Sequence, residues 1–459
     1  MATAAPGAER ASANKTEQRM EGASAAGLAS RRVAARALRG VLAGHRLQQA
    51  LDHALARESP RPEARERAFA YLITATSLRR RGQIDAVLAK LLEKPLPKDT
   101  GIARELLVTS AAQLLFLSAP AHAVVNSAVS IARAERAASR LAGLLNAVLR
   151  RVSERGAALL AGEDECIVNT PDWLHRRWRG NYGEDTARRI GCAHLAEPAL
   201  DVSVKDDAQR WAEKLGGIVL PTGSIRLSRG HQPVEELPGY EEGGWWIQDA
   251  AAALPSRLLG EVAGRRVADL CAAPGGKSAS LAARGAVVTA VEKDESRIGR
   301  IRQNLARLAL RAEVVHADAT SWGEPGSFDL VLLDAPCSST GTIRRHPDIP
   351  YLKRASDIGA LGRTQSALID AAVRLLKPGG RLVYCTCSLE PEEGEHQMAA
   401  ALRRLPGLLT DPVSPTELAG RKEWLTGEGY VRTMPFHYED QPEGMQGLDG
   451  FFIGRLRKT

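Results

Sequence analysis

The stretch Asp269-Leu-Cys-Ala-Ala-Pro-Gly-Gly-Lys277 decides the fold. It follows the apolar segment 266–270, which has the length and composition of a buried strand, and it leads into a helical pattern over 277–284. Gly275 and Gly276 let the backbone approach a ligand closely. Ligands of open parallel sheets bind at the carboxyl ends of the strands. The stretch therefore predicts a ligand-binding loop between a strand and a helix.

The end of this loop, Gly-Gly-Lys-Ser, is also found at the end of a phosphate-binding P-loop. A P-loop requires another glycine five residues before Gly276, and Cys271 stands at that position. A nucleotide hydrolase is therefore disfavoured.

The order of strand, loop and helix repeats along the rest of the chain. Candidate strands cover 266–270, 286–292, 312–316, 328–334 and 381–386. Helical patterns cover 277–284, 295–308, 357–376 and 392–405. Strands that are continuously rich in Val and Leu and alternate with helices predict a parallel sheet covered on both faces. Two late strands, 430–434 and 451–457, have no helix between them and predict an antiparallel hairpin at the sheet edge.

Acidic residues follow the strands after the glycine loop. Glu292 ends the second strand, where a carboxylate can accept hydrogen bonds from both hydroxyls of a ribose. Asp318 follows the third strand, in position to meet an adenine edge, and Asp334 ends the fourth. Any one of them would be explained as a helix cap or a solvated loop residue. Together with the Gly-Gly turn they predict a nucleoside-binding edge.

Two cysteines follow the fourth and fifth strands. Cys337 lies in Asp334-Ala-Pro-Cys-Ser-Ser-Thr-Gly-Thr-Ile-Arg-Arg-His346, and Cys387 lies in Thr386-Cys-Ser-Leu-Glu-Pro-Glu-Glu393. A free cysteine is usually a small buried hydrophobe, but two in polar loops at one sheet edge indicate reactive thiols. Cys385 lies within its strand and is less suited to react.

These motifs carry a family resemblance. Residues from about 30 to 459 resemble the bacterial 16S ribosomal RNA (cytosine-C5)-methyltransferases of the Fmu/Sun type, through DLCAAPGGK, LLDAPCSSTGTIRRHPDI, TCSLEPEE and the late Asp-Gly-Phe-Phe. The resemblance implies an α/β, Rossmann-like class I methyltransferase domain with a mostly parallel seven-stranded sheet and S-adenosylmethionine as cofactor. It implies that the cofactor is held by Cys271, Ala272, Ala273, Pro274, Gly275, Gly276, Lys277, Glu292, Asp318 and Asp334.

The same resemblance implies that Cys387 is the nucleophile and that Cys337 assists product release. A thiolate that adds to C6 of cytosine makes C5 an enamine-like carbon, which attacks a methyl sulfonium; a base then removes the C5 proton and the thiolate leaves. In the more distant DNA cytosine-C5 methyltransferases a Pro-Cys dipeptide attacks. The Pro-Cys pair of this sequence is Pro336-Cys337, so the alternative in which Cys337 attacks and Cys387 assists release stays open.

Residues 31–155 hold the positive excess of the chain. They carry 22 Lys or Arg against 10 Asp or Glu, whereas the whole chain has a net charge of +8. Such a concentration favours a polyanionic partner, and an Arg-rich solvated surface is the alternative. Helical patterns cover 64–80, 82–92, 101–117, 123–137 and 141–152. The segments HAVVNSAVSIAR at 122–133 and GLLNAVLRR at 143–151 resemble the antitermination factor NusB, which implies RNA binding.

The sequence predicts four segments. Residues 1–29 form a disordered tail, 30–155 an all-α NusB-like domain, 156–262 a small mixed α/β subdomain facing RNA, and 263–459 the methyltransferase domain. In the subdomain, strands are expected at 200–205 and 217–220. Trp173 and Trp178 are expected to pack, and the arginines between and beside them to contact RNA.

Other classes are excluded or kept as alternatives. No apolar run would cross a membrane, no secretory signal is present, and the histidines and cysteines show no zinc spacing. We therefore expect a cytoplasmic protein, a monomer, with neither membrane nor metal as a partner and with RNA, most simply 16S ribosomal RNA, as its substrate. The alternatives are the same chemistry on transfer RNA or 23S ribosomal RNA, and an RNA-binding assembly factor without catalysis.

Overall fold

The computed structural model describes residues 27–228 and 233–459, which form two compact units. The helical unit holds the described residues up to Asp172 together with His346–Leu352. The catalytic unit holds Trp173–Arg345 and Lys353–Thr459. Residues 1–26 of the predicted tail lie outside the described residues, and 27–42 are helical.

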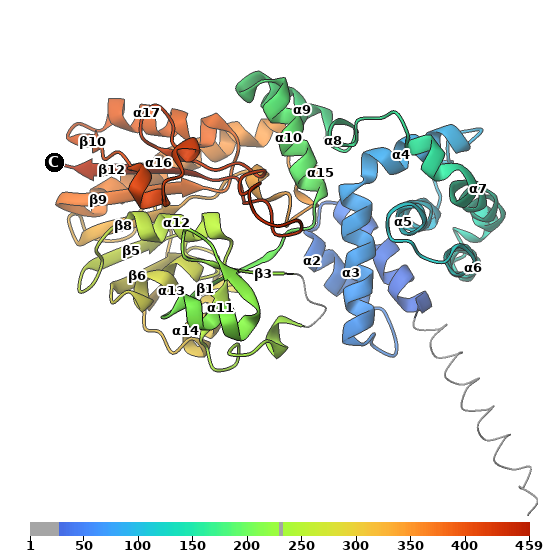
Figure 1. Cartoon of the computed structure of the whole chain (residues 1–459), viewed down its shortest axis with the longest axis horizontal. Coiled ribbons are helices and arrows are strands. Elements are labelled where there is room, and N and C mark those ends of the chain that lie inside the picture. The colour runs from blue at the N-terminus through green and yellow to red at the C-terminus, as the bar shows by residue number, and fades with distance from the viewer. Residues whose placement is uncertain (1–26, 229–232) are drawn as a thin grey trace, which may run out of the picture. The chain divides into compact units, whose positions relative to one another are not determined.

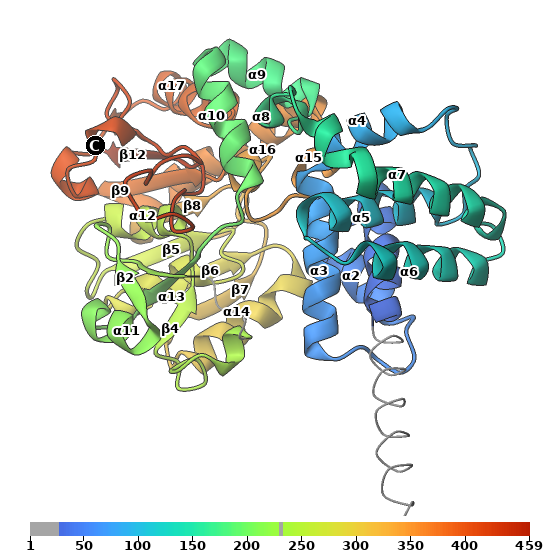
Figure 2. The same cartoon turned by 45° about the vertical axis from the view of Figure 1, so that its right-hand side comes forward.

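All secondary structure in the described residues of the helical unit is helical, and its part before residue 172 runs from blue to teal in Figures 1 and 2. After the helix at 27–42 come α2 Leu47–Leu55, α3 Ala64–Arg79, α4 Arg81–Leu91, α5 Ala103–Phe116, α6 Ala121–Ala134, α7 Ala142–Leu160 and α8 Glu165–Val168. Aliphatic side chains from nearly all of them form one core. None of the described helices is long and apolar enough to cross a membrane.

One segment of this unit comes from the middle of the chain. Residues 346–352 contain the short helix α15, Ile349–Leu352. The Asp348 carboxylate accepts a hydrogen bond from the backbone N–H of Leu47 at 2.9 Å, and the Tyr351 hydroxyl donates to the Leu78 carbonyl at 2.9 Å. Two of its side chains therefore attach the segment to α2 and α3 of the helical unit.

The catalytic unit begins with two helices and a small antiparallel sheet. These elements are α9 Asp172–Tyr182, α10 Glu184–Leu195, β1 Leu200–Val204, α11 Ala208–Leu215, β2 Gly217–Val219, β3 Ile225–Leu227 and β4 Trp245–Ile247. The sheet order is β2-β3-β1-β4. The strands predicted at 200–205 and 217–220 are present as β1 and β2. The strands β3 and β4 were not predicted, because three residues are too few to show an alternating pattern.

The large sheet carries the site. Its elements are α12 Ala250–Leu258, β5 Arg266–Leu270, α13 Gly276–Ala283, β6 Val287–Glu292, α14 Glu295–Arg307, β7 Glu313–His316, β8 Phe328–Asp334, α16 Ala355–Leu375, β9 Leu376–Thr386, α17 Glu395–Arg404, β10 Leu408–Thr410, β11 Val431–Arg432 and β12 Phe452–Lys458. The strand order is β10-β12-β9-β8-β5-β6-β7, and β11 pairs with β12. From β9 to β7 every pairing is parallel.

Both faces of this sheet are buried, as the continuous apolar runs predict. Successive residues of β8 belong to different cores: Leu330 and Leu332 pack with α12, whereas Val331 and Leu333 pack with α16 and α17. Figures 1 and 2 show α16 and α17 on one side of the sheet and α12 and α13 on the other. The predicted α/β Rossmann-like fold with a mostly parallel sheet is confirmed, but the described sheet has eight strands instead of seven, because the short β11 pairs with β12 beside the main order.

The predicted carboxyl-terminal hairpin is present, but it does not form the edge. β11 pairs antiparallel with β12, and β12 lies between β9 and β10, antiparallel to both. The outer strand β10 was not predicted because it is only three residues long. The antiparallel strand β12 extends the sheet beside β9, and six residue pairs join the two strands.

Candidate active site

The glycine loop lies at the point where the sheet changes direction. From β5 the chain runs outward through β6 to β7, and β8 and β9 then lie on the other side of β5. Ligands of open α/β sheets bind at such a switch point, beyond the carboxyl ends of the strands. The loop after β5 and Asp334 at the end of β8 both lie there.

Glu292 supports the glycine loop. Its side chain is 5% exposed, and one carboxylate oxygen accepts the backbone N–H of Ala273 at 3.2 Å while the other accepts those of Lys293 and Asp294, each at 3.0 Å. Gly275 has a φ of +100°, in the left-handed region where glycine has no steric penalty. The Glu292 carboxylate therefore fixes the loop in addition to any contact it makes with a ligand.

Lys277, the last residue of the loop, pairs with Asp334 at 2.7 Å. Burial alone would lower the pKa of Lys277, but the Asp334 carboxylate reverses this and raises it. Asp269 lies below the loop, where burial raises its pKa to about 7. One Asp269 oxygen accepts a hydrogen bond from Ser278 at 2.5 Å, and the other has no hydrogen-bond partner among the described residues.

Asp318 lies at the end of β7 and is more exposed than the other predicted acidic residues. Its carboxylate pairs with Lys293 at 2.6 Å and accepts hydrogen bonds from the backbone and the hydroxyl of Thr320. These contacts, that of Lys293 first, lower the pKa of Asp318 to about 2. Asp318 is thus charged, and Lys293 connects it to the strand end that carries Glu292.

The structure brings Cys337 and Cys387 together, with their sulfur atoms 3.5 Å apart. The hydrogen bond between the two sulfurs, more than burial, raises the pKa of Cys337, and the same bond lowers the pKa of Cys387 against the effect of burial. Ser339 and Lys277 lower the pKa of Cys387 further. The pair therefore favours a thiolate at Cys387 that is held by the Cys337 thiol.

The two other free cysteines of the catalytic unit remain thiols. Cys385 is fully buried and donates a hydrogen bond to Asp334 at 3.5 Å, and its pKa is raised by burial. Burial, with the nearby carboxylates, raises the pKa of Cys271 to about 12. Only one of the four sulfurs, that of Cys387, is activated.

A buried carboxylate that the sequence analysis did not single out joins the two cysteine loops. Glu393 accepts hydrogen bonds from the backbone N–H of Ser338 at 3.0 Å and from the hydroxyls of Ser338 and Ser388, at 2.5 and 2.6 Å. Gln365 donates to it at 3.1 Å. Ser338 directly follows Cys337 and Ser388 directly follows Cys387, so Glu393 holds the two cysteine loops, and with them the two sulfur atoms, next to each other. Its position at the end of the quoted Cys387 motif was the available signal.

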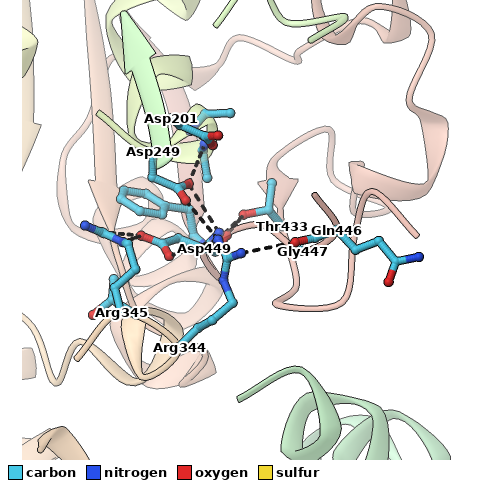
Figure 3. Close-up of polar contacts among 12 residues, drawn as sticks. Asp201, Asp249, Arg344, Arg345, Thr433, Gln446, Gly447 and Asp449 are labelled. Carbon is cyan, nitrogen blue, oxygen red and sulfur yellow. Dashed lines mark hydrogen bonds and ion pairs between the residues drawn. The ribbon is translucent and has the colours of Figure 1, made fainter. Parts of the chain in front are cut away.

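A second unpredicted group is a buried cluster of charges (Figure 3). Arg344 contacts Asp249 at 3.1 Å and Asp449 at 3.8 Å, and Arg345 pairs with Asp449. Nearby, Asp201 holds Arg226 through two hydrogen bonds. The cluster fixes the loop that follows Cys337 to the start of α12 and to the segment before β12. The sequence gives little sign of it, because its members are far apart along the chain.

The aromatic and basic segment of α9 faces its own unit. Trp178 is fully buried and its indole N–H donates to Glu390 at 3.2 Å, so the expected packing of Trp178 is observed. Arg177 pairs with Glu390 at 2.5 Å and with Glu392 at 2.7 Å. Two carboxylates thus hold the Arg177 guanidinium group, and the expected RNA contact of the arginines in this segment stays a prediction.

A parallel sheet with this switch point, one reversed strand beside β9 and a glycine loop after β5 defines a Rossmann-like methyltransferase. The comparisons with known proteins agree. Residues 257–457 match the family described as 16S rRNA methyltransferase RsmB/F, and residues 28–154 match the NusB family. The chain belongs to the 16S rRNA methyltransferase RsmB/F family and is an RNA methyltransferase.

Similar proteins cover almost the whole chain. The ribosomal RNA small subunit methyltransferase B of Xanthomonas campestris pv. campestris is 36% identical, over 95% of this chain and 98% of its own length. That of Vibrio cholerae is 37% identical, over 90% of this chain and 94% of its own.

Two solved structures have the same fold. The crystal structure of PH0851 aligns with a TM-score of 0.73 at 24% identity, over 94% of this chain and 99% of its own. A methyltransferase homolog protein from Pyrococcus horikoshii aligns with a TM-score of 0.51 at 28% identity, over 65% of this chain and 96% of its own.

Proposed function

We propose that this protein transfers a methyl group from S-adenosylmethionine to C5 of a cytosine in 16S ribosomal RNA, through a covalent bond between Cys387 and C6 of the base. The observation that carries the proposal is the sulfur pair, Cys337 and Cys387 at 3.5 Å, with the pKa of Cys387 lowered. Lys277 and Asp334, which act electrostatically on Cys387, connect this pair to the glycine loop. A nucleophile beside a nucleoside-binding loop is the arrangement that the reaction needs.

The loop after β5 fits the cofactor. The Asp269 oxygen without a partner among the described residues is a buried acceptor at this loop, suited to a ligand donor such as an ammonium group. S-adenosylmethionine, when bound, supplies an electrophilic methyl group. We assign its binding to Cys271, Ala272, Ala273, Pro274, Gly275, Gly276, Lys277, Glu292, Asp318 and Asp334.

Cys387 begins the reaction by adding its thiolate to C6, and the electrons of the C5–C6 double bond move toward C5. Lys277 is protonated at neutral pH and stabilises the negative charge that develops on the ring, and Asp334 holds the Lys277 ammonium group in place. C5 then takes the methyl group. Removal of the C5 proton by a base restores the C5–C6 double bond, and the Cys387 thiolate leaves.

Cys337 assists this release. While Cys387 is a thiolate, the hydrogen bond between the sulfurs is the first cause of the raised pKa of Cys337. That cause disappears once the sulfur of Cys387 is bonded to carbon. The Cys337 sulfur can then exchange protons more easily during removal of the C5 proton.

The helical unit is assigned to RNA binding. Twelve Lys and Arg side chains in this unit are exposed and take part in no ion pair among the described residues: Arg46, Arg57, Arg61, Arg65, Arg67, Lys94, Lys98, Arg104, Arg133, Arg136, Arg150 and Arg155. Such cations are available to phosphates. The division at residues 30–155, 156–262 and 263–459, the cytoplasmic location and the monomeric state are part of the same proposal.

The test uses the full chain, a 16S ribosomal RNA transcript and methyl-labelled S-adenosylmethionine. We expect 5-methylcytidine as the labelled nucleoside after complete digestion, and one modified position by bisulfite mapping. A label on any other nucleoside would contradict the proposal. Labelling of transfer RNA or 23S ribosomal RNA in preference would favour the alternative substrates.

Glu292→Ala is expected to weaken cofactor binding by roughly ten- to a hundredfold, because a charged acceptor worth about 1.5–3 kcal/mol is lost. The loop contact to Ala273 is lost with it. Isothermal titration calorimetry measures the dissociation constant. Glu295→Ala, an exposed acidic residue in the first turn of α14, is the control and should bind as the wild type does. Equal cofactor affinity of both variants would show that Glu292 does not bind the cofactor.

Glu393→Gln is expected to lower kcat by about tenfold to a hundredfold, because a small displacement of reacting groups has effects of this size. The dissociation constant of the cofactor should not change. Alkylation of Cys387 by iodoacetamide at pH 7 should also slow, since the sulfur pair loses its alignment.

Glu392→Gln is the matched control, because the Glu392 side chain is partly exposed and pairs with Arg177 on the other side of the motif. Thermal melting of both variants shows whether the fold is kept. A folded Glu393→Gln enzyme with the kcat and the alkylation rate of the wild type would show that Glu393 does not position the cysteines.

A further inference from the structure

A basic pocket lies outside the candidate active site. It has a volume of about 350 Å³ and lies between β1 and β4 of the small sheet and the helices α12 and α13. Its polar lining consists of Lys205, Arg257, Arg284, Ser203, Ser280 and the indole of Trp246. No acidic residue lines it.

The three cations of this pocket have no carboxylate partner among the described residues. Lys205 donates a hydrogen bond to the Leu308 carbonyl at 3.0 Å, and Arg284 donates to the carbonyls of Ser256 and Gly260. Arg257 has neither an ion pair nor a hydrogen bond in the part of the chain that the structure describes. Arginine in folded proteins normally pairs its fork of N–H groups with a carboxylate or a phosphate.

The cations also act on one another. Burial first and Arg284 second lower the pKa of Arg257, and burial lowers the pKa of Arg284. Glu261 acts on Arg284 from a distance and forms no ion pair with it among the described residues. Partly buried like charges without a paired anion destabilise the folded protein, and a bound anion would relieve this. The hydroxyl of Ser280 accepts a hydrogen bond from Ser256, which leaves its own hydrogen for a ligand.

We propose that this pocket binds a phosphodiester group of the RNA substrate, through Arg257, Lys205 and Arg284, as an anchoring contact away from the target base. The proposal rests on the proposed function only in taking RNA as the substrate. A phosphate group matches the chemistry of the lining, since its oxygens accept hydrogen bonds from a guanidinium fork, an ammonium and a hydroxyl together. Such a contact gives affinity and orientation without reading sequence.

The test compares Arg257→Gln and Arg257→Lys with the wild-type protein. Binding of a labelled 16S ribosomal RNA transcript is measured by fluorescence anisotropy at several potassium chloride concentrations. Arg257→Gln should bind several-fold more weakly at low salt, and the slope of log K against log salt should fall by about one, as for one lost phosphate contact. Arg257→Lys keeps the charge and should keep the slope. Arg404→Gln, which loses a pair with Asp370, is the control and should match the wild type.

A folded Arg257→Gln protein with the affinity and salt slope of the wild type overturns the proposal. Inorganic pyrophosphate distinguishes the source of the phosphate: if it raises the melting temperature of the wild type but not of Arg257→Gln while the RNA titrations agree, the pocket takes a free phosphate compound. Methylation of the same transcript by the wild type is measured separately. If the wild type does not methylate the transcript, the proposed function is contradicted. If the wild type methylates it normally and Arg257→Gln binds RNA as the wild type does, only the proposal for the pocket is contradicted.

Discussion

Cys387→Ser is expected to lower methyl transfer by at least about a thousandfold and to form no covalent complex with RNA, because a lost nucleophile removes the covalent route. A serine hydroxyl at neutral pH is not ionised, and the hydrogen bond from Cys337 cannot make it so. Cofactor affinity should be unchanged, since none of the residues assigned to the cofactor is altered.

Cys337→Ser should act differently. Attack and methyl transfer depend on Cys387 and should proceed, but release should stall because a serine hydroxyl does not exchange protons as a thiol does. A protein–RNA adduct that survives denaturation should therefore accumulate in the presence of S-adenosylmethionine. A denaturing gel with labelled RNA detects it.

Cys385→Ser is the matched thiol control for this pair. Cys385 is fully buried, so its serine variant should keep turnover and trap no adduct. If the adduct appears with Cys387→Ser and not with Cys337→Ser, the two roles are exchanged, as in the Pro-Cys alternative. An adduct in neither variant would contradict the covalent route.

Arg344→Met is expected to lower the free energy of unfolding of the catalytic unit by about 3–5 kcal/mol, because it leaves the buried Asp249 carboxylate without its ion-pair partner and Asp449 with Arg345 alone. The Arg344, Asp249 and Asp449 side chains are at most 3% exposed. Urea denaturation followed by tryptophan fluorescence measures the loss. All seven tryptophans lie between residues 173 and 424, in the catalytic unit, so the signal reports this unit alone.

The stability that Arg344→Met loses should depend on pH. Burial raises the pKa of Asp449 to about 6, so its contribution to stability is present at low pH and is lost as the pH rises through 6. Burial would also raise the pKa of Asp249, but Arg344 is the strongest of the cations that lower it. Without Arg344 the pKa values of both carboxyls rise. The deficit of Arg344→Met should therefore shrink between pH 8 and pH 5.

Two further variants control the Arg344 experiment. Asp249→Asn added to Arg344→Met should recover part of the lost stability, since one unpaired carboxylate is removed. Arg421→Met breaks a more exposed pair with Asp440 and should lose less than about 1 kcal/mol. A deficit for Arg344→Met that is as small as that for Arg421→Met, or that grows toward pH 5, would contradict the account of the cluster.

The parallel strands and the helices between them could be predicted because local pattern determines them. The strands β5 and β8 begin and end where the apolar runs do, and the loop 269–277 places the ligand edge. The boundaries of β9 were less accurate, because Lys377-Pro-Gly-Gly380 breaks its apolar pattern although the strand begins at Leu376.

Contacts between distant segments could not be predicted in the same way. The sequence places Cys337 and Cys387 at one sheet edge, but only the structure shows the sulfurs in contact and the pKa shifts that separate them. Glu393 lies six residues beyond Cys387, and its role depends on Ser338 in another loop. The partner of Arg344, Asp249, comes from a segment 95 residues away, with no periodicity to link them.

The segment His346–Leu352 makes the amino-terminal helices difficult to detach as a module. It follows directly on the Cys337 loop, yet it belongs to the helical unit, so the polypeptide passes between the two units three times. An engineered protein lacking residues 1–172 would retain Tyr351 and Leu352 without the helical core against which they pack, and Asp348 without the N–H of Leu47. Exchange of this RNA-binding part between relatives, by recombination or by design, therefore also requires grafting seven residues into the middle of the catalytic half.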